Sequence, residues 1–132
     1  MKALKLILAI NAFLTIAAFI LGSFFPSVLF EWVGVTISHS ENLAPYMLGA
    51  AELPIGFLSL AIMTIKDVRS VRLMSLAFAI FHFASVLEEL HATTQGIEGG
   101  AVVPNMILRT TLGLLFLYFG YFKIPADRPV NW

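Results

Sequence analysis

The chain has 132 residues, of which 59% are hydrophobic and 12% are charged, and its mean hydropathy is +0.90. Soluble domains carry about 25% charged residues, so this composition excludes an ordinary soluble domain and indicates an integral membrane protein. The net charge is zero without a run of like charges, which gives no basis for a nucleic-acid partner, and the lack of cysteine excludes disulfide, thiolate and iron–sulfur chemistry.

Four segments are long and apolar enough to cross a bilayer, which requires about 20 residues: 4–25, 45–65, 71–90 and 104–122. The first has a basic start like that of a signal peptide. Its uncharged run over residues 6–28 is longer than the roughly 7–15 residues of a signal peptide's apolar region, so we expect a retained helix. The sequence therefore predicts one all-α domain over residues 1–132, folded as an integral membrane four-helix bundle.

The loop after the first span contains the sequence FPSVLFEWVGV. Pro26 is expected to end the first span, and the residues that follow suit a short helix lying in the membrane interface. Trp32 would then sit at the level of the lipid headgroups, where tryptophan is enriched.

Basic residues gather on the side of the predicted membrane that holds both termini and the second loop: Lys2, Lys5, Lys66, Arg69, Arg72, Lys123 and Arg128. The positive-inside rule makes this side cytoplasmic. We therefore expect a multi-pass protein of the bacterial inner (plasma) membrane, with membrane lipid as its surroundings and both termini in the cytoplasm.

Three predicted spans each carry a polar residue that lipid would not tolerate. At the helical rise, Glu52 lies about 10 Å below Pro45, Arg109 about 7 Å below Pro104, and His82 about 12 Å inside the outer boundary. A charged side chain at this depth costs a few kcal/mol unless it faces the bundle interior and finds a partner. We therefore expect Glu52, His82 and Arg109 to meet at one depth, with one glutamate paired to the arginine.

The third span ends in HFASVLEELH. At about 100° per residue, Glu89 falls near the face of His82, whereas Glu88 and His91 point elsewhere and are expected at a wet rim. The predicted catalytic residues are Glu52, His82 and Glu89, with either glutamate as the proton carrier and the histidine as its relay. The predicted ligand-binding residues are Arg109, Asn105, Tyr46 and Trp32, with Tyr46 at the mouth.

Other polar and small residues suggest how the helices pack. Asn11 and Thr15 in the first span are expected to form interhelical hydrogen bonds. Pro54 removes a backbone hydrogen bond near Glu52, which favours a kink beside a cavity. Small residues that let helices approach closely are expected on the contact faces of the second and fourth spans: Gly49, Ala50, Ala51, Gly56, Gly113 and Gly120.

A metal site is an alternative reading of the same stretch. Glu88 and His91 have the spacing of half a di-iron motif, and His39 in the first loop is a further candidate ligand. A di-iron bundle needs two such motifs and more glutamates, so we expect no metal and no other cofactor.

The fourth span, LRTTLGLLFLYFGYFKIP, resembles the R-x-x-L-G-x-x-F-x-x-x-G-x-x-K run that DoxX-type membrane proteins carry in their first span. The stretch LGAAELPIGFLSLAI is similar to the acid-bearing second span of that group and of related uncharacterised bacterial families, which also share F-F-P at the end of the first span. This resemblance implies a four-helix bundle and little about a reaction.

Two functions fit these patterns. The first is a polar pocket in the outer half of the bilayer that binds a small lipophilic molecule, with isomerase- or cyclase-like acid–base chemistry as its possible reaction. The second is a non-enzymatic accessory subunit of a homo-oligomer or larger membrane complex, in which the same residues form a structural ion pair. The sequence does not decide whether the protein is an enzyme.

Overall fold

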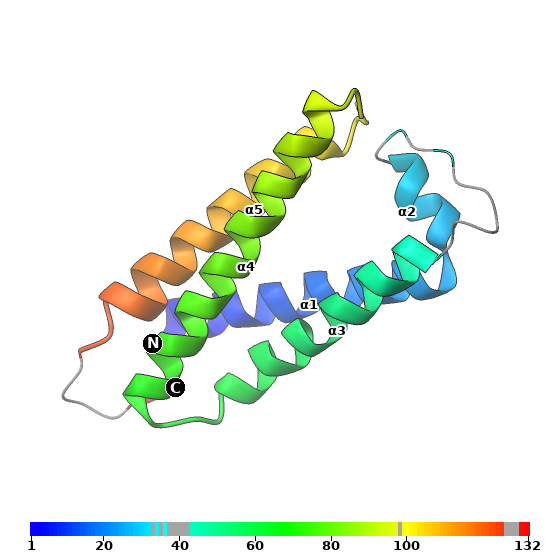
Figure 1. Ribbon diagram of the computed structural model, residues 1–132. Coiled ribbons are helices and arrows are strands. Elements are labelled where there is room, and N and C mark those ends of the chain that lie inside the picture. Colours follow the sequence, from blue (N-terminus) through cyan, green and yellow to red (C-terminus); the bar gives the residue numbers. More distant parts are fainter. Residues whose placement is uncertain (33, 35, 37–42, 98, 126–129) are drawn as a thin grey trace.

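The computed structural model describes residues 1–32, 34, 36, 43–97, 99–125 and 130–132, which are helical and contain no strand. The elements are α1 (Lys2–Phe24), α2 (Pro26–Trp32), α3 (Leu43–Ile62), α4 (Val68–Thr94), α5 (Val102–Leu115) and the π-helix η2 (Phe116–Phe122), which continues α5 (Figure 1). The all-α prediction is confirmed for these residues, and so is the short helix expected after the first span, which is α2.

Among the described residues, three helices are long and apolar enough to cross a membrane: α1, α4 and the continuous helix Val102–Phe122. Helix α3 contributes a shorter apolar stretch, Tyr46–Ile62. These four helices coincide with the four predicted spans, although their ends differ by a few residues. Helix α4 differs most, because it extends past the predicted 71–90 at both ends.

The start of α4 is set by Asp67, which is its N-cap. One carboxylate oxygen of Asp67 accepts hydrogen bonds from the backbone N–H of Ser70 at 2.8 Å and from its hydroxyl at 2.5 Å. These two bonds, the hydroxyl first, lower the pKa of Asp67 from its ordinary value. An Asp cap of this kind satisfies one of the free N–H groups in the first turn.

The end of α4 is set by a glycine. Gly96 has a φ of +84°, a conformation that other residues adopt only with strain. Its N–H donates to the Thr93 carbonyl at 3.0 Å, and the N–H of Ile97 donates to the Ala92 carbonyl at 3.2 Å. This is the Schellman arrangement, which satisfies the last carbonyls of a helix before the chain turns.

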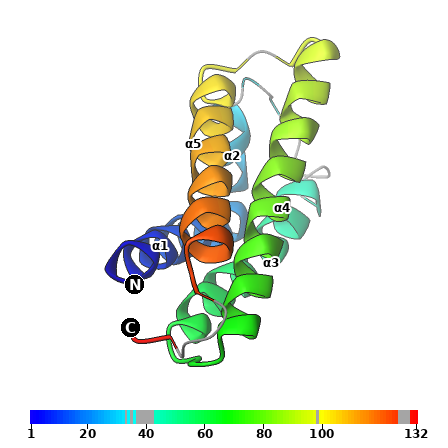
Figure 2. The same cartoon turned by 90° about the vertical axis from the view of Figure 1, so that its left-hand side faces the viewer.

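The helices pack in two pairs, α1 with α3 and α4 with α5 and η2. The pairs overlap at the end that holds both termini and the α3–α4 connection, which we call the termini end, and diverge at the other (Figures 1 and 2). The diverging end, which we call the loop end, holds α2 and the α4–α5 connection. The pairing of helices and this divergence position the site.

Glycines lie where the helices of each pair approach most closely. A Cβ on Gly56 of α3 would lie 2.6 Å from Cγ1 of Ile16 on α1, and one on Gly49 would lie 3.2 Å from the Phe19 carbonyl. A Cβ on Gly113 of α5 would lie 2.8 Å from the ring of Phe83 on α4, and Gly120 of η2 is equally crowded by Ser75. The predicted contact faces are confirmed at these four glycines, whereas the prediction is wrong for Ala50 and Ala51, which are exposed because they point away from α1.

The termini end contains the apolar core. Its most deeply buried members, each 1% exposed or less, are Leu4, Leu8, Ile62, Val71, Phe78, Ala79 and Phe116. The last residues of the chain close over this end, since the Val130 N–H donates to the Lys66 carbonyl at 3.0 Å and the Trp132 indole donates to the Ile65 carbonyl at 2.7 Å. The termini end is therefore packed with side chains, whereas the loop end is open.

Candidate functional site

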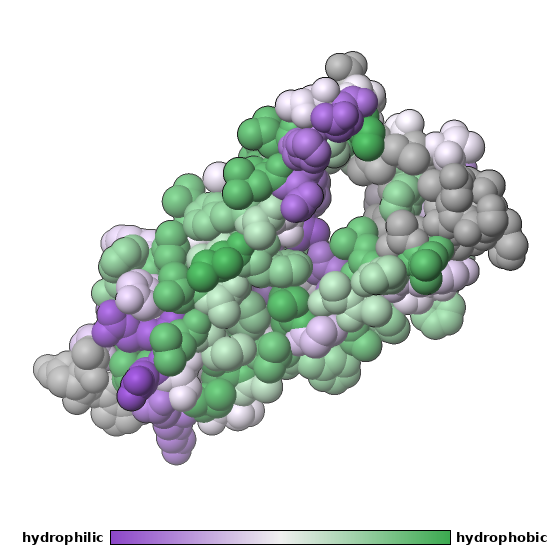
Figure 3. Space-filling view, in the orientation of Figure 1, coloured by the Kyte–Doolittle hydropathy of each residue, from purple (hydrophilic) through white to green (hydrophobic). Residues whose placement is uncertain are grey.

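A cavity of about 480 Å³ lies at the loop end, where the two helix pairs diverge. The space-filling view shows a hollow between the upper part of α4 and α5 and the end that holds α2, with hydrophilic surface along one edge (Figure 3). Its apolar lining is Ala18, Phe30, Trp32, Leu48 and Ala101, and its polar lining is Glu52, Ser85, Glu88, Glu89, Asn105 and Arg109. All five α-helices or the residues that flank them contribute to this lining.

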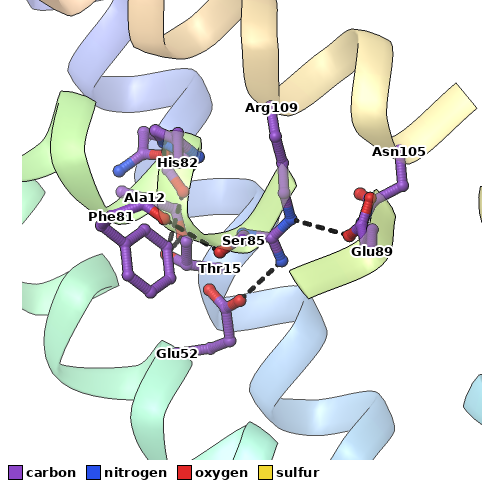
Figure 4. Close-up of polar contacts among 10 residues, drawn as sticks. Ala12, Thr15, Glu52, Phe81, His82, Ser85, Glu89, Asn105 and Arg109 are labelled. Atoms are coloured by element: carbon purple, nitrogen blue, oxygen red, sulfur yellow. Dashed lines mark hydrogen bonds and ion pairs between the residues drawn. The ribbon is translucent and has the colours of Figure 1, made fainter. Parts of the chain in front are cut away.

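Arg109 forms the centre of the polar lining. Its Nη2 donates to Oε1 of Glu52 at 2.8 Å and its Nη1 donates to Oγ of Ser85 at 3.2 Å. Its Nε lies 3.5 Å from Oε1 of Glu89, close enough for an ion pair but without hydrogen-bond geometry. The arginine from α5 thus reaches α3 and α4 at once (Figure 4), and it joins the two helix pairs where they begin to diverge.

The two glutamates around Arg109 differ in accessibility. The side chain of Glu52 is 2% exposed, whereas that of Glu89 is 23% exposed. The Asn105 amide donates a hydrogen bond to Oε1 of Glu89, while the Oε2 atoms of both glutamates have no hydrogen-bond partner among the described residues. Each carboxylate therefore has one buried oxygen without a partner, and the side chain of Glu89 is the one that an incoming molecule reaches more easily.

A second cavity, of about 110 Å³, also has the ion pair in its lining. Glu52, Asn105 and Arg109 line both cavities, and the smaller one adds His82 and Thr15. A polar space of this size is large enough to hold a few water molecules. The Glu52–Arg109 pair therefore borders both the larger cavity, which we call the outer chamber, and the smaller one, which we call the inner chamber.

His82 lines the inner chamber but does not bond to either glutamate. Its Nε2 lies 2.9 Å from Oδ1 of Asn11 on α1, and its Nδ1 has no partner in the described part of the chain. The Asn11 amide in turn donates to Oγ of Ser59 on α3 at 2.8 Å. Because the asparagine oxygen only accepts, Nε2 carries the proton in this arrangement. The His82 ring also stacks on Phe116, with 5.9 Å between ring centroids.

These bonds test the sequence expectations for α1. The predicted interhelical bond of Asn11 is confirmed, because it joins α1 to both α3 and α4. The expectation for Thr15 is wrong, because its hydroxyl donates to the backbone carbonyls of Asn11 and Ala12 in its own helix. A threonine hydroxyl on a helix can reach the carbonyl one turn back without any partner helix, and Thr15 forms this local bond instead of an interhelical one.

Local sequence explains how two of the lining residues are positioned. Pro54 lies inside α3, where it has no N–H to donate to the carbonyl of Ala50, so the helix lacks this backbone hydrogen bond two residues before Glu52. Trp32 ends α2, and its carbonyl accepts a hydrogen bond from the N–H of Ala101 at 3.1 Å. This bond links the end of α2 to the start of α5 and keeps the Trp32 ring beside the cavity.

The remaining predicted site residues have different positions. Glu88 is exposed and lines the outer chamber, at the rim where it was expected. The described lining residues do not include Tyr46 or His91, both of which are exposed, and Leu48 occupies the part of α3 nearest the mouth. His39 lies outside the described residues, within which no group of three His, Cys, Asp and Glu side chains is arranged to hold a metal ion.

Sequence reasoning missed Ser85 and Ser59, which bind Arg109 and Asn11. A signal for Ser85 was present, because it lies three residues after His82 and four before Glu89, on one face of a helix. Ser59 lies seven residues after Glu52, which also places it on the same helix face. Serine is common on contact faces as a merely small residue, so its position alone does not reveal a polar partner.

No protein-family model matches the chain, and no characterised protein sequence or solved structure matches it. The resemblance to DoxX-type proteins therefore stays a prediction, and the function has to be argued from the geometry of the site.

Proposed function

We propose that the protein is a four-span membrane protein of the bacterial inner membrane, with the termini end in the cytoplasm, that binds a small lipophilic molecule in the outer chamber. Three helices of membrane length and a fourth apolar helix support the four spans. The orientation is supported by the basic residues of the termini end, because positive charge favours the cytoplasmic side.

The single observation that carries the binding function is the outer chamber itself. Its volume of about 480 Å³ lies within the range of roughly 300–1,000 Å³ that small-molecule sites occupy. An apolar wall with Phe30 and Trp32 faces a polar wall centred on Arg109. Sites of this class combine an apolar lining with a few convergent polar groups, and ionisable side chains within a membrane most often serve a function.

The closed termini end favours binding over passage across the membrane. Below the inner chamber, the path between the helices is filled by the apolar core, including Leu8, Phe78 and Phe116, none more than 1% exposed. The polar groups therefore form a pocket entered from one side, which suits a bound molecule better than a transported ion.

Within this pocket, Glu89 is the residue best placed for acid–base chemistry of the isomerase or cyclase type. Its Oε2 is buried and free of hydrogen bonds, while its side chain as a whole is partly accessible, as a proton carrier requires. Glu52 is buried against Arg109, so we assign it the role of fixing the arginine rather than of carrying the proton. Arg109 is then the electrostatic anchor, and His82 reaches the site only through the inner chamber.

Mass spectrometry of lipophilic molecules that co-purify with the protein tests the binding function. Ala18 lines both chambers, so Ala18→Leu fills part of the site, whereas Ala50→Leu adds the same volume at an exposed position of the same helix pair. We expect a molecule that co-purifies with the wild type and the Ala50 variant but not with the Ala18 variant. Equal recovery from all three folded proteins would count against a ligand in this cavity.

A second candidate, the accessory subunit, is favoured by the same ion pair, because it joins helix pairs that otherwise contact each other little at the loop end. In that case Glu89→Gln leaves assembly with a larger complex unchanged, because Glu89 is not part of the closest pair. Co-purification of the same protein partners with wild type and Ala18→Leu, without any bound lipophile, would favour this candidate over the first.

A further inference from the structure

The charges around the outer chamber are unbalanced. Three carboxylates, those of Glu52, Glu88 and Glu89, line it, and among the described residues Arg109 supplies the only positive charge in that lining. Ionised together, these groups leave an excess of two negative charges at a site that is partly shielded from water. A low-dielectric setting makes such an excess costly unless a positive charge joins it.

The unpaired hydrogen-bonding groups at the site also favour a positively charged ligand. Each of the two terminal guanidinium nitrogens of Arg109 donates one hydrogen bond, one to Glu52 and the other to Ser85. Two acceptors at the site also lack a partner, because Oε2 of Glu52 and Oε2 of Glu89 are buried and accept no hydrogen bond from the described residues. Glu52 is only 2% exposed, so its spare oxygen is a buried acceptor that lacks a donor rather than one served by bulk solvent.

The opposite wall adds aromatic surface. Phe30 and Trp32 of α2 line the same cavity, and the ring faces of phenylalanine and tryptophan attract cations. A negatively charged head group would meet three carboxylates around a single guanidinium, and their excess negative charge would repel it even though three of the five guanidinium N–H groups make no hydrogen bond. A neutral hydroxyl could donate one hydrogen bond but would leave the charge excess in place.

We propose that the molecule bound in the outer chamber is an amphiphile with a cationic, hydrogen-bond-donating head group of the protonated-amine class. The amine lies beside the carboxylates of Glu88 and Glu89, which are the more accessible ones of the lining, and its apolar body lies against Phe30 and Trp32. This inference rests on the proposed function, since it names the class of ligand for the same cavity.

The two tryptophans of the chain make a direct test possible. Trp32 lines the cavity, whereas Trp132 is held at the termini end by its bond to the Ile65 carbonyl. In the variant Trp132→Phe, tryptophan emission therefore reports on the cavity alone, and in Trp32→Phe it reports on the far end of the molecule. Three probes share a phenylalkyl body and differ in charge: phenylbutylamine, phenylbutanol and phenylbutanoate.

We expect the amine to change Trp32 emission in nanodiscs at a concentration about tenfold or more below that needed for the alcohol, with no saturable response to the carboxylate. Glu89→Gln should weaken amine binding about tenfold, the equivalent of one charge-assisted hydrogen bond, and leave alcohol binding unchanged. Glu31→Gln removes the same charge from an exposed position of α2 outside the lining and should change neither. Trp132 emission in Trp32→Phe should not respond.

The outcomes separate this inference from the function on which it rests. Binding of the alcohol or the carboxylate as tight as that of the amine, or an amine affinity that Glu89→Gln does not change, would overturn the cationic head group while leaving a pocket. No response of Trp32 to any probe would contradict the lipophile-binding pocket itself. An equal response of Trp32 and Trp132 would show adsorption to the bilayer and would also overturn the inference.

Discussion

Nη2 of Arg109 donates to Oε1 of Glu52 across 2.8 Å and joins α5 of one helix pair to α3 of the other. The side chains are 15% and 2% exposed, so the contact is largely shielded from water. It lies at the floor of the outer chamber, where the helix pairs start to diverge. The same pair thus holds the fold together and forms the boundary of the site.

Replacing Arg109 by methionine should leave the Glu52 carboxylate buried without its partner. We expect the free energy of unfolding to fall by about 3 kcal/mol, the usual cost of breaking a buried ion pair from one side. The double variant Glu52→Leu/Arg109→Met removes both charges and should recover most of that loss. Reversible unfolding in mixed micelles measures all three proteins, and a double variant that is no more stable than the single one would show that the two residues act independently.

Ser59→Ala tests the hydrogen bond that the Asn11 amide of α1 donates to Ser59 of α3. The change leaves the Asn11 amide without its acceptor, so we expect a loss of about 1–3 kcal/mol in the free energy of unfolding. Ser59 lines neither chamber, so binding of any ligand in the outer chamber should be unchanged once the variant is folded. A variant of normal stability would mean that water replaces the hydroxyl.

The meeting of Glu52, His82 and Arg109 around one pair of cavities was predictable from depth alone. The bilayer has one thickness and a helix one rise, so a residue count from each boundary converts directly into a depth. The cost of an unpaired charge in lipid then requires the residues at one depth to face one another. The same argument could not tell whether Glu52 or Glu89 approaches Arg109 more closely, because that depends on the rotation of each helix about its own axis.

Features that depend on which helices are neighbours could not be predicted. The partner of His82 is Asn11 because α1 approaches α4 across the bundle, and no pattern in either segment encodes that neighbour. The change from α5 to the π-helix η2 at Phe116 is also invisible in the sequence, because a run of mostly apolar residues continues across it without a proline. Phe116 is the residue that stacks on His82, and π-turns often occur near functional sites.

Gly56→Ala tests the close approach of α1 and α3. The added methyl group would lie 2.6 Å from Ile16 and 2.8 Å from the Thr15 hydroxyl, so the helices must shift, at an expected cost of about 1–3 kcal/mol. Gly100→Ala is the matched control, since nothing lies within 4 Å of its added methyl group, and the expected change is within about 0.5 kcal/mol. The unfolding midpoints of the two variants should therefore differ clearly, and equal midpoints would contradict the packing of this pair.

Asp67 gives the chain a pH-dependent element outside the spans. Its folded pKa is lowered by the Ser70 hydroxyl and amide, so its charged form stabilises the folded state above the ordinary value of 3.8. That contribution is lost as the pH falls through the lowered pKa, where the carboxylate becomes protonated in the folded protein as well. Asp67→Asn keeps a capping side chain without the charge, and its unfolding temperature should lie below that of wild type at neutral pH and approach it under acid conditions. If the difference in unfolding temperature between wild type and Asp67→Asn instead grew as the pH falls, the charged form of Asp67 would not be the stabilising one.

Single introduced cysteines test the proposed orientation, because the chain has none of its own and any label reports on the new position alone. Gln95→Cys lies beyond the end of α4 at the loop end, and Lys66→Cys lies in the α3–α4 connection at the termini end; both side chains are exposed. One predicted span separates them, so a membrane-impermeant maleimide should label the cysteine at 95 in intact cells and the cysteine at 66 only after permeabilisation. The reverse pattern would place the outer chamber on the cytoplasmic side and its ligand with it. Labelling of both in intact cells would mean that α4 does not span the membrane, and the depth argument for Glu52, His82 and Arg109 would fail with it.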